Sequence, residues 1–158
     1  MQTLNSPLEL GVRAVIILRR AFPGTLDLEH LVLMDYCLLH SEDLSGPQSV
    51  LPPIPNRSGE LGIKRSVLEH GIQVMVRAGL IDLVVNPDGV VYRASEDASP
   101  FLDTIVSPLV EDLDAVATWA VDEFAEVSAT EIRARIRDVS ELWTEEFEIT
   151  ATGSEANE

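Results

Sequence analysis

Residues 80–93 constrain the fold most, because they predict one β-hairpin in a chain whose other patterns are helical. The runs 80–85 and 90–93 are rich in Leu, Ile, Val and Tyr, and Asn86-Pro87-Asp88-Gly89 separates them. A Pro-Asp-Gly turn between two β-prone runs is typical of a hairpin. The sequence therefore predicts a fold that is mainly α with a small β-hairpin.

The predicted helices lie on both sides of this hairpin. Apolar residues recur there at helical spacing, and Ser, Thr, Pro or Gly stands where each helix begins or ends. In chain order the predicted helices run over 7–22, from a Thr25 cap to about His40, from a Ser58 cap to Gly79, from Ser99-Pro100 with a second start at Ser107-Pro108, and from a capping box at Ser128-Ala129-Thr130-Glu131.

A proline-rich stretch, residues 42–57, interrupts this helical pattern. It contains four of the nine prolines, so regular structure is not expected there. A loop of about 15 residues inside a domain is uncommon and is typical of a binding element or a mobile segment. We therefore propose as partner-binding candidates in this loop Val50, Leu51, Ile54 and Arg57.

The order helix, helix, long loop, helix, hairpin, helix is that of a winged helix-turn-helix, with extra N- and C-terminal helices in this chain. In a DNA-reading member of that class, the third helix enters the major groove. Lys64 and Arg65 near the start of this helix, and Arg93 on the hairpin, are then the candidate phosphate contacts. The alternative is that these side chains are solvated charges on an ordinary exposed surface.

Charge is distributed very unevenly along the chain. The net charge is −16; residues 1–93 hold eight Lys/Arg against ten Asp/Glu, whereas residues 94–158 hold three against seventeen. A protein that binds nucleic acid alone normally presents a basic surface. DNA contact must therefore be confined to a small patch or be made through a partner.

The sequence offers no recognisable catalytic or metal-binding pattern. The three histidines do not form a metal-ligand motif, and Gly59-Glu60-Leu61-Gly62-Ile63-Lys64 lacks the spacing of a phosphate-binding loop. Cys37 is expected to be a buried structural thiol in a reducing compartment. No signal peptide or membrane-spanning run is visible. We expect a cytoplasmic protein that is not an enzyme, with no catalytic residue, metal or cofactor.

The length of 158 residues fits one domain. We place it over residues 5–149, with an acidic helical extension from about 100 to 149, and expect 150–158 to be a disordered tail. Trp143 and Phe147 lie four residues apart on the predicted last helix, among glutamates. These two rings either dock on the core of the domain or insert into a partner groove.

Five segments, taken in order, resemble the middle component of bacterial three-component systems built around an ABC ATPase, which include Lamassu-type anti-phage defence. The resemblance covers roughly residues 5–149. The segments are Asn5-Ser6-Pro7-Leu8-Glu9, Asp35-Tyr36-Cys37-Leu38-Leu39-His40-Ser41, Arg57-Ser58-Gly59-Glu60-Leu61, Ser107-Pro108 ahead of a helix with Trp119 and Phe124, and Trp143-Thr144-Glu145-Glu146-Phe147.

This resemblance implies a winged-helix subunit without catalysis of its own. It implies that the subunit sits on an SMC-like or Rad50-like ABC ATPase and links it to an effector, often a nuclease. Protein partners then come first, and DNA is reached through the assembled complex. The alternative from the residues is a winged-helix transcription regulator that dimerises through its terminal helices.

Overall fold

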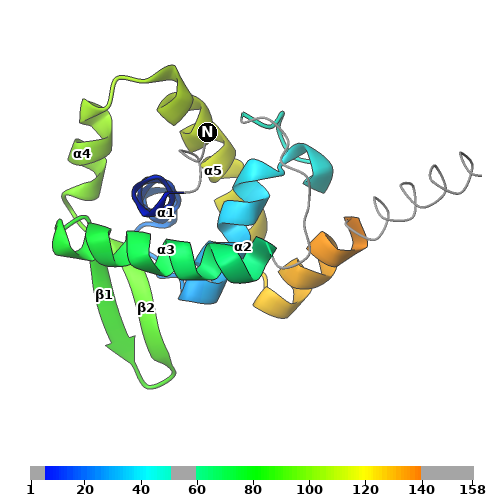
Figure 1. Ribbon diagram of the computed structural model, residues 1–158, viewed down its shortest axis with the longest axis horizontal. Helices are drawn as coiled ribbons and strands as arrows, with labels where there is room; N and C mark the ends of the chain where they lie inside the picture. The colour runs from blue at the N-terminus through cyan, green and yellow to red at the C-terminus, as the bar shows by residue number, and fades with distance from the viewer. Residues whose placement is uncertain (1–5, 51–59, 140–158) are drawn as a thin grey trace, which may run out of the picture.

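The computed structural model describes residues 6–50 and 60–139, and this part is mainly helical with one two-stranded antiparallel sheet (Figure 1). The predicted fold class is confirmed at this level. The elements are α1 (Pro7–Ala21), α2 (Leu28–Leu39), the short 3₁₀ helix η2 (Glu42–Leu44), α3 (Glu60–Arg77), β1 (Ile81–Asn86), β2 (Gly89–Ala94), α4 (Ala98–Thr104), α5 (Pro108–Phe124) and a helix over 129–139.

Helix α1 is the centre of the domain, and Figure 1 shows it nearly end-on among the other elements. It contacts α2, α3, α4, α5 and β2. Its residues from Ala14 to Leu18 are all buried, and this run of five apolar residues covers every side of the helix over that stretch. Pro7 opens the helix, and the Ser6 hydroxyl accepts a hydrogen bond from the Glu9 amide at 3.2 Å.

Helix α2 begins later than the sequence predicts. Asp27, and not Thr25, caps it, with its carboxylate accepting a hydrogen bond from the His30 amide at 2.7 Å. The physical reason is that Leu26 is held in extended backbone, because it exchanges two hydrogen bonds with Tyr92 of β2. Residues 31–41 are then buried without interruption, which places α2 inside the fold.

Helices α1 and α3 cross at two glycines. A Cβ atom added at Gly71 would lie 2.3 Å from the Pro7 carbonyl oxygen, and one added at Gly11 would lie 2.8 Å from the Gly71 carbonyl oxygen. No side chain fits between the two backbones there. This close approach sets the position of α3, and of the hairpin that follows it, against the core.

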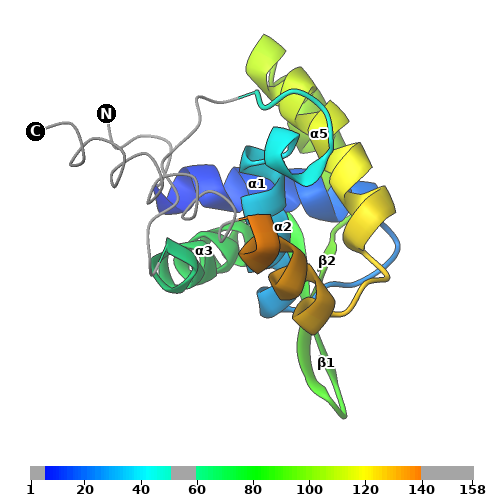
Figure 2. The same cartoon turned by 90° about the vertical axis from the view of Figure 1, so that its right-hand side faces the viewer.

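The predicted hairpin is confirmed. Gly79 adopts a φ of +78° where α3 ends, and Asn86 pairs with Gly89 across the tight turn. The Asp88 amide donates to the Asn86 side chain at 3.0 Å, which stabilises the turn. In Figures 1 and 2 the hairpin extends away from the helices, with only its base against them.

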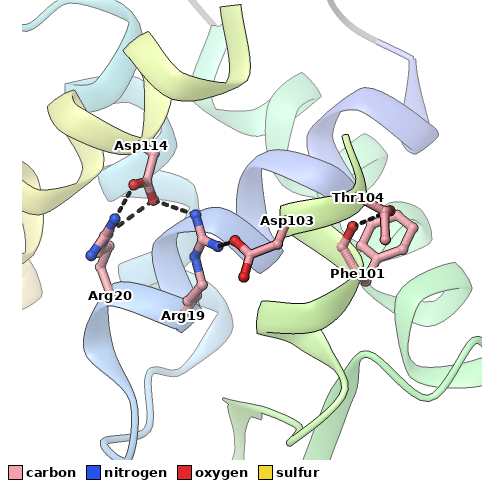
Figure 3. Close-up of polar contacts among 6 residues, drawn as sticks. All are labelled: Arg19, Arg20, Phe101, Asp103, Thr104 and Asp114. Carbon is pink, nitrogen blue, oxygen red and sulfur yellow. Dashed lines mark hydrogen bonds and ion pairs between the residues drawn. The ribbon is translucent and has the colours of Figure 1, made fainter. Parts of the chain in front are cut away.

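Arginines at the end of α1 bind the acidic C-terminal half, as Figure 3 shows. Arg19 Nη2 lies 2.8 Å from Asp114 of α5, and its Nη1 lies 3.1 Å from Asp103 of α4. Arg20 binds the same Asp114 carboxylate through Nε at 2.9 Å and through Nη2. Partial burial raises the pKa of the Asp114 carboxyl, but hydrogen bonds from Arg20 and Arg19 lower it below its usual value.

The segment after α2 is more ordered than its prolines suggest. It contains η2, and Gly46 lies so close to the indole of Trp119 that a Cβ atom there would come within 2.4 Å of the ring. The expectation of no regular structure in residues 42–57 is therefore wrong at its beginning. The last predicted helix is confirmed as far as residue 139, and the Ser128 hydroxyl accepts a hydrogen bond from the Glu131 amide at 3.2 Å.

Candidate partner interface

A buried cluster of three charges joins α1, α2 and α3. Asp35 accepts hydrogen bonds from Arg13 Nε at 2.7 Å, from Arg13 Nη2 at 3.2 Å and from Lys64 Nζ at 2.9 Å. All three residues are buried, and Lys64 is only 6% exposed. The Lys64 ammonium also lies 5.8 Å from the centre of the Tyr36 ring, within cation–π range.

The cluster fixes the ionisation of the groups around it. Burial raises the pKa of the Asp35 carboxyl, but the charges and hydrogen bonds of Lys64 and Arg13 lower it to about 2. Asp35 is therefore an anion at neutral pH. Burial raises the pKa of the neighbouring Cys37 thiol to about 12, so that group is not a thiolate. The expectation of a buried thiol at Cys37 is confirmed.

The expectation that Lys64 contacts phosphate at the surface is wrong. Lys64 lies on the buried side of α3, in the same stripe as Leu68, Ile72 and Met75, and its ammonium is held by Asp35. The signal was present in the sequence, because Lys64 precedes Leu68 by four residues and so shares its face. A charged side chain in an apolar stripe indicated a buried ion pair.

The two other predicted phosphate contacts do reach the surface. Arg65 is exposed on α3, and Arg93 of β2 lies 3.9 Å from Asp82 of β1. Partial burial raises the pKa of the Asp27 carboxyl, but hydrogen bonds from His30 and the charges of His30 and Arg65 lower it. Arg93 and Arg65 therefore each act on a carboxylate of this chain, which reduces the positive potential that they offer to phosphate.

The most exposed apolar side chains of the hairpin lie on one of its faces. The register pairs Leu83 with Tyr92 and Val85 with Val90, so these four side chains point to the same side. Val85 is 74% exposed, Leu83 49% and Val90 43%. We call these four residues the hairpin face. The sequence predicts the strands but not this surface, since strand propensity does not show which face stays uncovered.

Residues 3–146 match the family described as ABC-three component (ABC-3C) system Middle Component 2. The chain belongs to this family. The middle-component resemblance drawn from the five sequence segments is thereby confirmed. A middle component of a three-component system has protein partners. No curated protein and no solved structure matches the chain significantly.

The remaining predicted contact residues of the middle component divide into two groups. Val50 is partly buried and packs against the core, so it supports the fold and is not a fully exposed docking side chain. The other five lie outside the described residues: Leu51, Ile54, Arg57, Trp143 and Phe147.

His30 of the middle component has partners that its sequence context did not indicate. Its ring Nδ1 lies 2.9 Å from the Asp27 carboxylate, and its Nε2 lies 2.9 Å from the Val127 carbonyl oxygen. It thus joins the start of α2 to the turn before the last helix. Within residues 6–50 and 60–139, no group of three or more His, Cys, Asp or Glu is placed to hold a metal ion. No helix in this part is long and apolar enough to cross a membrane.

Proposed function

We propose that this middle component is a non-catalytic adaptor that binds an SMC-like or Rad50-like ABC ATPase and couples it to a nuclease-type effector. The complex would be a Lamassu-type anti-phage or anti-plasmid defence assembly in the cytoplasm. Family membership supports the proposal that the chain works as a subunit with protein partners, since a middle component has such partners. The resemblance described above supports the identity of those partners.

The observation that carries the proposal is that the surface formed by α3 and the hairpin is apolar and mixed in charge instead of basic. Lys64 is withdrawn into the core, and Arg93 lies beside Asp82. Residues 78–92, which include the hairpin tip, contain no Lys or Arg. Such a surface suits a protein partner better than a phosphate backbone.

We also propose a winged helix-turn-helix arrangement for the described elements. The chain order α1, α2, α3, hairpin supports it, as does the pairing of Leu26 with Tyr92, which adds a short third strand segment between α1 and α2. In this arrangement α3 takes the place of the recognition helix and the hairpin that of the wing. The fold then serves protein recognition with elements that other members of the class use on DNA.

The adaptor role predicts that the chain forms a stable complex with the other two components of its own system. Co-expression with an affinity tag on this chain, followed by size-exclusion chromatography, is expected to recover all three proteins in one peak at physiological salt. Elution of the chain by itself, with defence activity unchanged when its gene is deleted, would contradict the adaptor role.

The same surface predicts weak DNA binding by the isolated chain. We expect a Kd for duplex DNA no tighter than the non-specific range of about 10⁻⁴–10⁻⁶ M, because few free cations face the solvent on α3 and the hairpin. Fluorescence anisotropy at physiological salt measures it. The Arg65→Glu, Arg93→Glu double variant should weaken this signal further, because non-specific DNA binding depends on exposed cations. Nanomolar, sequence-selective binding would instead support the transcription regulator.

A further inference from the structure

The outer side of β1 is an open strand edge. Both backbone groups of Tyr92 in β2 are hydrogen-bonded to Leu26. The Tyr92 amide donates to the Leu26 carbonyl at 2.8 Å, and the Tyr92 carbonyl accepts from the Leu26 amide at 2.9 Å. Tyr92 and Leu83, which face each other across the hairpin, therefore form a non-hydrogen-bonded pair. Hydrogen-bonded and non-hydrogen-bonded pairs alternate along an antiparallel ladder, so Val85 and Val90, two residues further on, also form a non-hydrogen-bonded pair. The backbone N–H and C=O groups of Leu83 and Val85 thus point away from β2.

No described element covers this edge. The sheet contains only β1 and β2, with the Leu26 bridge on the far side of β2, and Figure 1 shows nothing along the outer side of β1. The side chains of Leu83 and Val85 are among the more exposed large apolar groups of the described chain. Natural proteins usually protect such edges with charge, proline or a covering segment. An edge with outward backbone groups and exposed apolar side chains is a template for strand addition.

The charges around the edge indicate the chemistry of its partner. Residues 77–97 hold four carboxylates, two on the hairpin and two after it, against two arginines. Asp82 lies on β1 itself, and a shallow cleft at the base of the hairpin is lined by Asp82, Glu96 and Asp97 together with Arg93. An added strand therefore binds best when its apolar side chains contact the hairpin face and its Lys or Arg side chains contact the carboxylates at the bottom of the hairpin.

We propose that the outer edge of β1 binds an extended segment of another component of the system, with alternating apolar and basic residues, by strand addition. This inference rests on the adaptor role proposed above. A second copy of this chain fits the edge poorly. Each copy carries a net charge of −16, so two copies repel each other.

Two proline substitutions test the edge directly. Val85→Pro removes an amide that points to the outer side of β1, whereas Val90→Pro removes the equivalent amide on the outer side of β2. Both residues lie on the hairpin face, so the apolar surface changes similarly. In a titration of the purified chain against the other two co-expressed components, Val85→Pro should weaken binding about tenfold or more, and Val90→Pro should leave it within about twofold. Thermal melts check that both variants stay folded.

Hydrogen exchange on the wild-type complex gives a second measurement that needs no variant. The amides of Leu83 and Val85 should exchange freely in the isolated chain and become protected in the complex. Unprotected amides, Val85→Pro binding like the wild type, or equal losses for both variants would overturn the proposal. So would a dimer of the isolated chain that Val85→Pro dissociates. If the wild type fails to bind the other components at all, the adaptor role itself fails, which is a distinguishable result.

Discussion

Asp35→Ala is expected to lower the free energy of unfolding by about 3–5 kcal/mol, or to prevent folding altogether. The substitution leaves the Arg13 and Lys64 cations buried without the carboxylate that both of them contact. Two like charges then remain in a medium of low dielectric, where desolvation is costly. Urea denaturation followed by circular dichroism measures the change. Asp112→Ala, at an exposed aspartate of α5, is the matched control and should shift the value by no more than about 0.5 kcal/mol.

The same cluster predicts how stability depends on pH. The pKa of the Asp35 carboxyl is about 2 in the folded chain, against the ordinary value of 3.8. Because the pKa of Asp35 is lower in the folded chain, its ionisation stabilises the folded state at pH values above the ordinary pKa. This contribution to the free energy of unfolding is lost as the pH falls from about 4 toward 2. It amounts to roughly 2 kcal/mol. The stability gap between wild type and Asp35→Asn should therefore narrow over that range. A gap that stays constant from pH 5 to pH 2 would contradict the assigned ion pair.

Gly71→Ala is expected to lower the free energy of unfolding by about 3 kcal/mol. The new Cβ atom would lie 2.3 Å from the Pro7 carbonyl oxygen and 2.8 Å from the Gly11 nitrogen. Both are backbone atoms, so α1 and α3 must separate to admit the methyl group. Chemical denaturation measures this loss.

Gly62→Ala is the matched control on the same helix. Nothing lies within 4 Å of a Cβ atom at Gly62, and alanine favours a helix over glycine by about 0.5–1 kcal/mol. The control should therefore be as stable as the wild type or slightly more so. Equal stability of the two variants would show that the glycine crossing tolerates separation, which would contradict this account of how α1 and α3 pack.

Elements with local signals could be predicted from the sequence. The hairpin follows from Asn86-Pro87-Asp88-Gly89, and the end of α3 follows from Gly79, whose φ of +78° suits glycine. The last helix follows from the capping box at Ser128. Each of these features depends on a few adjacent residues, so no knowledge of distant contacts was needed.

Features that depend on distant contacts could not be predicted in the same way. The place of Lys64 in an apolar stripe indicates that it is buried, but its partner Asp35 lies 29 residues earlier, and the sequence does not show that contact. The start of α2 shifted because Tyr92, far along the chain, holds Leu26 in extended backbone. Val85 is exposed because no described element packs over it, and the pattern of residues in a strand does not show which elements will pack against that strand.

The central place of α1 has a consequence for synthesis of the chain on the ribosome. The apolar surface of α1 is translated first, but its cover includes α5, which is translated near the end of the described residues. Contacts between such distant segments form slowly, because a long loop must close before they are made. The nascent chain can cover α1 with α2, α3, β2 and α4 as they emerge, but the side of α1 that packs against α5 stays uncovered until α5 is translated. It needs protection from aggregation until Phe124 has emerged from the exit tunnel.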